Sequence, residues 1–253
     1  MAMPPLEDWP VLLADLRRRC RGLDGAALVR AVASEMFPGR IAVASSFGAE
    51  AAVMLDIVAE ADPAIPVIFL DTGKLFGETL RYRETLTKRL GLTDVRIVKP
   101  EPRDVAAQDP DGILWTRDPD ACCALRKVAP LARALEPFDA WITGRKRFHG
   151  GVRARVETIE LDDDGRVKLN PLATWSRERI LAHFQARGLP AHPLVADGYL
   201  SIGCMPCTDL PRPGEGVRDG RWTGLDKTEC GIHLGAGPSP RRSGSGRAGG
   251  AKR

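Results

Sequence analysis

Short apolar runs alternate with helix-like stretches through the first half of the chain, and this alternation is what most restricts its fold. The segments 40–48 ("RIAVASSFG"), 65–73 ("IPVIFLDTG") and 94–100 ("DVRIVKP") each have the pattern of a buried strand. Helices are predicted between them at 49–61 and 77–91. Strands and helices alternating in this way form a parallel sheet with helices on both faces. We therefore predict a Rossmann-like α/β fold.

Further elements are expected on both sides of this region. The spacing of leucines and valines predicts helices over 6–36, interrupted at "RGLDG". A helix over 121–136 should be kinked or divided by Pro130. A strand at "DAWITG", two strands around "DDDGR" and a helix over 176–188 follow. After residue 190 the chain becomes rich in loops. The predicted units are N-terminal helices at 1–38, a nucleotide-binding α/β domain at 39–210, a mobile C-terminal segment at 211–235 and a disordered basic tail at 236–253.

Charge and hydropathy narrow the possible partners. The formal net charge is +4, but residues 241–253 hold five basic residues and no acid, so the remainder carries about −1. The folded part is therefore not a polycation, and no nucleic-acid partner is predicted. No signal peptide and no membrane-spanning run is evident, so we expect a cytoplasmic protein with reduced cysteines.

Two loops are expected at the carboxyl edge of the sheet, where open α/β sheets bind ligands. In "SSFGAE" (45–50), small residues turn tightly between a strand and a helix, a geometry that binds anions. It lacks the lysine of a Walker A loop, and the chain lacks a G-x-G-x-x-G fingerprint. In "LDTGKLFGET" (70–79), Asp71 and Thr72 could hold a ribose or an adenine.

The six cysteines include a pair and a C-x-x-C motif. Cys122 and Cys123 are adjacent, and Cys204 and Cys207 lie in "GCMPCT". Together they offer four sulfur ligands from two segments, which suits either tetrahedral Zn²⁺ or an iron–sulfur cluster. The spacing does not separate these two possibilities.

A fifth cysteine and two basic runs complete the candidate site. Cys230 lies in "KTECGIHLG" near Lys227, Glu229 and His233, and a thiol among cations can ionise and act as a nucleophile. "TGRKRFHGGVRAR" (143–155) leaves a predicted strand end, and "GVRDGRW" adds two more arginines. Such charge suits a phosphosulfate group.

From about residue 40 to residue 235 these motifs resemble the assimilatory sulfonucleotide reductases, the adenylylsulfate and phosphoadenylylsulfate reductase family. "SSFGAE" resembles its modified PP-loop, "TGRKRFHGGVR" its basic loop and "ECGIH" its catalytic C-terminal motif. The resemblance implies a PP-loop-like (adenine nucleotide alpha hydrolase) fold. The "CC" and "CxxC" motifs are similar to the branch with one [4Fe–4S] cluster per subunit, held here by Cys122, Cys123, Cys204 and Cys207.

The resemblance also implies a reaction. The Cys230 thiolate attacks the sulfur of adenylylsulfate, AMP leaves, and reduced thioredoxin or glutaredoxin releases sulfite from the S-sulfocysteine. A homo-oligomer is expected. The implied substrate-binding residues are Ser45, Ser46, Phe47, Gly48, Asp71, Thr72, Lys127, Lys146, Arg147, Arg153, Arg218, Arg221 and His233.

Three alternatives stay open from the sequence. The substrate could be phosphoadenylylsulfate. An ATP-using PP-loop thiolation enzyme would typically show an SGGxDS loop, which "SSFGAE" does not match. A zinc-stabilised, non-catalytic nucleotide- or nucleic-acid-binding protein would leave "ECGIH" without a role.

Overall fold

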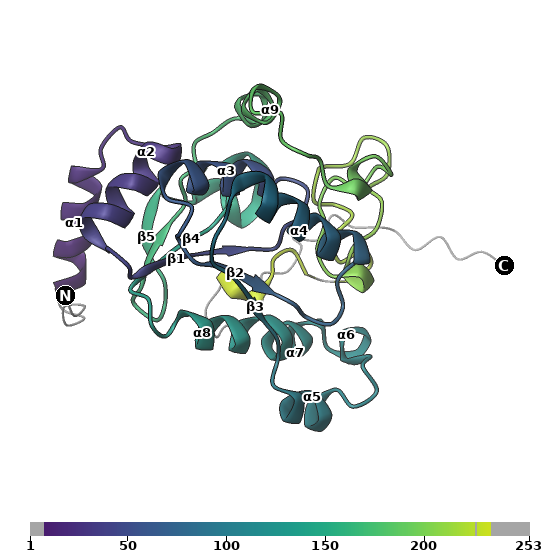
Figure 1. The fold of residues 1–253 in the computed structure, drawn as a ribbon. Helices are drawn as coiled ribbons and strands as arrows, with labels where there is room; N and C mark the ends of the chain where they lie inside the picture. The colour runs from purple at the N-terminus through teal and green to yellow at the C-terminus, as the bar shows by residue number, and fades with distance from the viewer. Residues whose placement is uncertain (1–7, 226, 234–253) are drawn as a thin grey trace.

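A six-stranded sheet forms the centre of the computed structural model, which describes residues 8–225 and 227–233 (Figure 1). Its strand order is β3-β2-β1-β4-β6-β5, and the five strands from β3 to β6 are parallel. Only β5 runs antiparallel, because the short turn after it leads directly back into β6. The strands are β1 (Ile41–Ser45), β2 (Val67–Leu70), β3 (Val95–Val98), β4 (Ala140–Ile142), β5 (Ile159–Leu161) and β6 (Val167–Leu169).

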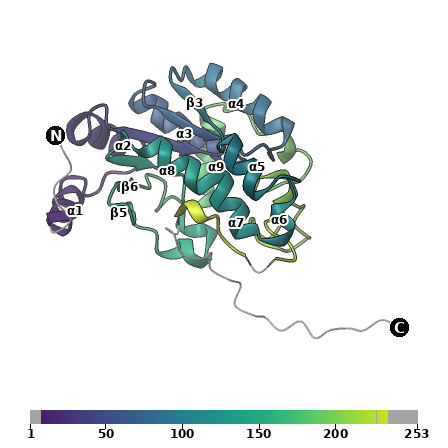
Figure 2. The same cartoon turned by 90° about the horizontal axis from the view of Figure 1, so that it is seen from below.

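Helices cover both faces of this sheet, as the alternating pattern predicted. In Figures 1 and 2, α2, α3, α4 and α9 lie over one face, while α5 to α8 lie over the other. The helices are α1 (Trp9–Arg19), α2 (Gly25–Arg30), α3 (Ala51–Ala61), α4 (Gly77–Leu90), α5 (Pro102–Gln108), α6 (Leu114–Arg117), α7 (Pro119–Cys123), α8 (Ala129–Leu135) and α9 (Arg177–Ala186).

The core lies on the two faces of the central strands. Val43 of β1 is fully buried and pairs with Val67 on one side and Ile142 on the other. Alternate residues of the same strands point to the opposite face, where Ala42 and Ile68 pack with α8. A continuous apolar run therefore suits these strands, because both of their faces are covered. The N-terminal helices share the larger cluster, which includes Leu16 of α1.

Local signals place two helix ends where the sequence predicted them. Ser176 caps α9 by accepting a hydrogen bond from Arg179 N at 3.2 Å. The α4 helix ends at Gly91, whose φ of 65° is a left-handed conformation that glycine adopts without strain.

The backbone of the predicted cysteine helix stays helical from α7 through α8, and it changes its winding just before Pro130. Between α7 and α8 the chain forms a π-helical segment, η3 (Ala124–Val128), and Pro130 lies in the first turn of α8. Proline has no N–H to donate inside a helix, and the wider π-helical turn directly before it locally replaces the regular α-helical pattern of hydrogen bonds. A second π-helical segment, η2 (Ala31–Met36), extends α2.

The described chain beyond α9 forms loops and short 3₁₀ turns, as predicted. These turns are η6 (Pro193–Val195), η7 (Met205–Cys207) and η8 (Gly231–His233), and two more, η4 (Arg147–His149) and η5 (Gly151–Arg155), follow β4. The predicted basic tail at 236–253 lies outside the described residues. None of the helices in the described part of the chain has the length and apolar character to cross a lipid bilayer.

Candidate active site

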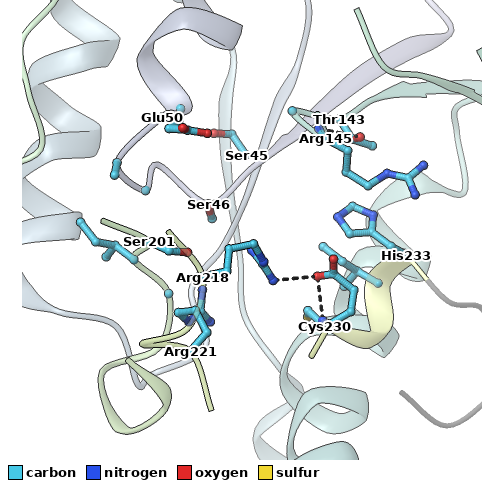
Figure 3. A pocket seen from close by; sticks show the side chains of 18 of the residues that line it. Ser45, Ser46, Glu50, Thr143, Arg145, Ser201, Arg218, Arg221, Cys230 and His233 are labelled. Carbon is cyan, nitrogen blue, oxygen red and sulfur yellow. Dashed lines mark hydrogen bonds and ion pairs between the residues drawn. The ribbon is translucent and has the colours of Figure 1, made fainter. Parts of the chain in front are cut away.

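A cavity of about 220 Å³ opens at the carboxyl edge of the parallel strands. Ser45, Thr72 and Thr143, which follow or end β1, β2 and β4, line its floor. Segments from the C-terminal part close the opposite side, and Figure 3 shows Arg218, Cys230 and His233 directed toward the same space as Ser46. The topology therefore brings together residues that lie far apart in the sequence.

The loop between β1 and α3 is shaped by an unusual backbone at Phe47. Its φ of 49° is left-handed, and its N–H donates to Ser45 Oγ at 3.2 Å. The ring is fully buried and packs edge-on against Phe69, with 5.4 Å between centroids. This anchor turns Ser45, Ser46 and Gly48 toward the cavity.

A carboxylate side chain, that of Glu50, lies at the N-terminus of α3. Glu50 immediately precedes α3 and lies 2.7 Å from Lys146 Nζ and 2.9 Å from His149 Nε2. Burial acts to raise the pKa of Glu50, but His149 and Lys146 lower it to about 2. Glu50 is therefore ionised at neutral pH, at the helix end where an anion would otherwise bind.

Basic side chains line one side of the cavity and are held by acids on other segments. Arg153 donates to both oxygens of Glu229, at 2.5 and 2.9 Å, and Arg218 Nη2 lies 3.3 Å from the same carboxylate. Burial and the neighbouring Arg153 lower the pKa of Arg218 to about 10, which leaves it charged at neutral pH. Together with Lys146, these cations suit a phosphate or sulfate group.

The guanidinium of Arg221 packs closely against the backbone of Gly203. A Cβ at Gly203 would lie 2.2 Å from Arg221 Nη2, so the flat guanidinium occupies the place of a side chain. Arg221 Nε donates to the Cys207 carbonyl oxygen at 3.1 Å, and the guanidinium lies 4.6 Å from the centre of the Trp222 ring. These contacts fix the direction of a cation that lines the cavity.

Cys230 reaches the cavity from the segment 227–233 and is 9% exposed. Its backbone N–H donates to Glu229 Oε1 at 2.9 Å (Figure 3). A hydrogen bond from the Cys123 thiol lowers the pKa of Cys230 well below its usual value, and Lys127 acts in the same direction against burial. The charge of Lys127, which does not depend on the protonation of Cys123, therefore favours the thiolate, the nucleophilic form of cysteine.

The four predicted ligand cysteines line a second, smaller cavity next to the first. It measures about 10 Å³ and is lined by Cys122, Cys123, Cys204 and Cys207 together with Lys127. Burial acts to lower the pKa of Lys127, but the thiols of Cys204, Cys230 and Cys123 raise it. Lys74 and Arg126 also line this cavity, and four thiols from two segments beside these cations fit the donor set of a tetrathiolate centre. Within residues 8–225 and 227–233, no three His, Cys, Asp or Glu side chains are grouped closely enough to be ligands of one metal ion.

The structure brings most of the predicted substrate-binding residues to the larger cavity. Those that line it are Ser45, Ser46, Gly48, Thr72, Lys127, Lys146, Arg153, Arg218, Arg221 and His233. Three do not. Phe47 is in the core, the Asp71 carboxylate turns back to accept from Gly73 N at 3.1 Å, and Arg147 Nε donates to the Val156 carbonyl oxygen at 2.7 Å.

Other residues at the cavity were not singled out from the sequence. Glu50, Arg145 and the loop at 200–203 also line it. Glu50 and Arg145 belong to motifs that the sequence analysis quoted, but only the fold shows that they face the cavity. The loop at 200–203 carries no charged side chain that could have marked it.

The doubly covered parallel sheet, with its ligand cavity at the carboxyl edge and a cysteine among cations, defines a nucleotide-binding α/β class. Residues 40–210 match the phosphoadenosine phosphosulfate reductase domain, and the chain belongs to this family. It is 51% identical to the adenosine 5′-phosphosulfate reductase of Mesorhizobium japonicum over 82% of this chain and 81% of the relative. It is 44% identical to the protein of the same name from Mycolicibacterium smegmatis, over 79% and 84% of the two chains.

Solved structures show the same fold. The phosphoadenylyl-sulfate reductase of Candida auris, in a phosphate complex, superposes with a TM-score of 0.67 at 25% identity, covering 83% of this chain and 99% of that one. The FMN adenylyltransferase of Candida glabrata has a TM-score of 0.51 at 16% identity over 82% and 74%. The second likeness concerns the fold alone.

Proposed function

We propose that the protein carries out the assimilatory reduction of adenylylsulfate to sulfite and AMP, in keeping with relatives that are named adenosine 5′-phosphosulfate reductase. The observation that carries this proposal is the position of Cys230, a buried thiol directed into a cavity that is lined by Lys146, Arg153, Arg218 and Arg221. The carboxyl edge of the sheet for the nucleotide, the basic side chains for the anion and the Cys230 nucleophile then line the same cavity.

The Cys230 thiolate is proposed to attack the sulfur of the sulfate group. A bond forms between Cys230 Sγ and sulfur, the bond from sulfur to the bridging oxygen breaks, and AMP leaves with that oxygen. The cations of the cavity stabilise the negative charge that develops on the departing phosphate. Lys127, which lies between the two cavities, adds charge beside both Cys230 and the substrate.

The enzyme then carries an S-sulfocysteine at position 230. A dithiol reductant, thioredoxin or glutaredoxin, is proposed to attack Cys230 Sγ with one thiolate, releasing sulfite with the electron pair of the S–S bond. Its second thiol resolves the mixed disulfide and returns Cys230 as a thiolate. Two thiols thus supply both electrons of the reduction.

The negative charge of Glu50 favours adenylylsulfate over phosphoadenylylsulfate as the substrate. Its ionised carboxylate already occupies the N-terminus of α3, so a further phosphate near this loop would meet like charge. Comparing turnover of the two sulfonucleotides tests this choice. Faster turnover of phosphoadenylylsulfate would reverse it.

One [4Fe–4S] cluster per subunit is proposed at the smaller cavity, with Cys122, Cys123, Cys204 and Cys207 as ligands. When bound it would tie the cysteine helix to the loop at 204–207, and the thiol chemistry requires no electron from it. Iron, zinc and acid-labile sulfide should be measured on anaerobically purified protein. Iron and sulfide near four per chain are expected. Zinc without sulfide would favour the non-catalytic alternative.

The decisive test of the reaction is Cys230→Ser. The variant should lose sulfite release while keeping its nucleotide affinity and its metal content, because the hydroxyl is a far weaker nucleophile than the thiolate. Cys20→Ser is the matched control, since Cys20 is buried on the C-terminal side of α1 and does not line either cavity. Retained turnover in Cys230→Ser would refute the nucleophile assignment.

A further inference from the structure

The segment 227–233, here called the catalytic segment, is held at both ends and in the middle. Lys227 Nζ donates to Asp120 Oδ1 at 2.5 Å and to the Pro119 carbonyl oxygen at 3.2 Å. Glu229 is clamped by Arg153 in the middle. The third attachment, at the far end, is apolar and involves the sheet itself.

Trp141 of β4 forms this third attachment. The His233 ring stacks on the Trp141 ring with 6.0 Å between centroids and an interplanar angle of 10°. Ile232 packs against the buried cluster that contains Trp141, Leu131 and Leu135. In Figure 1 the yellow turn η8 lies on the same side of the sheet as α8, and in Figure 2 it lies beside that helix.

The indole is itself rigidly placed. Trp141 is 2% exposed, and its Nε1–H donates to Asp162 Oδ2 at 2.8 Å. Lys168 Nζ, from the paired residue on β6, lies 4.9 Å from the centre of its ring. The Trp141 ring is therefore held in place by the sheet, whereas the His233 ring that stacks on it belongs to the catalytic segment.

We propose that Trp141 is a positioning residue that acts on Cys230 through His233 and Ile232. The single turn η8 follows Cys230 directly, so fixing its far end limits how the thiol can leave the cavity. The Cys230 thiol is 9% exposed, so it must move out of the cavity to contact a protein reductant. The stacked rings of Trp141 and His233 can separate for this movement without breaking a covalent or ionic bond. The relevance to turnover rests on the proposed function, but the docking itself does not.

The first experiment measures alkylation of individual thiols by iodoacetamide, read by mass spectrometry on anaerobically purified full-length protein. In Trp141→Leu, alkylation of Cys230 should be several-fold to about 10-fold faster than in the wild type, because a stacked aromatic contact is lost. Trp141→Phe keeps an aromatic face and should stay close to the wild-type rate. Cys20, 5% exposed and away from this contact, serves as the internal control for general loosening.

An unchanged Cys230 rate in Trp141→Leu, or an equal acceleration at Cys20, would overturn the proposal. Because Trp141 is in the core, His233→Leu provides a second approach from the segment side. If the two residues act as one contact, the double variant should show about the same acceleration as either single variant. Accelerations that multiply would mean that the two residues act independently, and the proposal would fail.

A second experiment separates the two halves of the reaction. Transfer of the sulfonate group to Cys230 should slow in Trp141→Leu, while release of sulfite from preformed S-sulfocysteine by reduced thioredoxin should keep its rate or become faster. Equal slowing of both halves would contradict a positioning role. If no variant or wild type forms sulfite but the alkylation pattern holds, the docking stands and the proposed function fails.

Discussion

The buried pair between Arg126 and Asp109 provides the sharpest stability prediction. Arg126, next to the cysteines on η3, donates to Asp109 Oδ2 from Nε at 3.1 Å and from Nη2 at 2.6 Å. Its Nη1 donates to the Thr72 carbonyl oxygen at 2.8 Å. The side chains of Arg126 and Asp109 are 8% and 0% exposed. One guanidinium thus joins the loop after β2, the end of α5 and the cysteine region.

Replacing Asp109 by Asn should leave the Arg126 charge buried without its counter-ion. Breaking such a pair from one side costs about 3 to 5 kcal/mol of unfolding free energy. For a chain of this size the midpoint of thermal unfolding should fall by about 6 to 20 °C. Because Arg126 also fixes the Thr72 carbonyl at the edge of the larger cavity, nucleotide affinity should fall as well.

Urea unfolding followed by circular dichroism measures the first effect, and Asp111→Asn is the matched control. Asp111 pairs with Arg117 at 2.9 Å, but both side chains are about half exposed, at 43% and 55%. An exposed pair of this kind contributes up to about 1 kcal/mol. If Asp109→Asn were no more destabilising than Asp111→Asn, the reasoning from burial would be refuted.

The pH dependence gives an independent check on Asp109. Burial acts to raise the pKa of Asp109, but hydrogen bonds from Arg126 and Leu114 lower it below its ordinary value. The stabilisation is therefore complete above about pH 4, the ordinary pKa of an aspartate, and is lost as the pH falls through the lowered folded value. The difference between wild type and Asp109→Asn should accordingly shrink in acid.

Three further predictions follow from single contacts. Gly203→Ala should weaken sulfonucleotide affinity by about 10-fold with unchanged iron content, because the new Cβ would displace Arg221 from the cavity proposed to bind the substrate; equilibrium binding tests this. Gly48→Ala should also weaken nucleotide binding in the same assay, since its Cβ would lie 2.8 Å from the Ile202 carbonyl oxygen. Burial lowers the pKa of Lys168 to about 7, so the charged lysine destabilises the folded state. Lys168→Met should therefore raise the unfolding free energy most below about pH 7. The gain should vanish above about pH 10.4, the ordinary pKa of lysine, where the side chain is neutral in both states. Unfolding curves across this range would contradict the last prediction if the gain grew with pH.

The amino-acid sequence determined the class of fold and the chemical groups of the candidate site. Apolar runs of strand length between helical stretches favour a covered parallel sheet, and this pattern is local. The paired cysteines, the C-x-x-C motif and the Cys230 segment are equally local. Cysteine and arginine have few alternative uses in such settings, so their residue types already limited the chemistry.

The tertiary structure decided which side chains face the cavity. Phe47 and Asp71 belong to the predicted loops, yet one ring is in the core against Phe69 and the other side chain turns back to its own loop. The stacking of His233 on Trp141 joins residues on distant parts of the chain. Periodicity reports only local backbone geometry, whereas the direction of a side chain at a strand end depends on packing between distant segments. That packing exists only once the whole chain has folded.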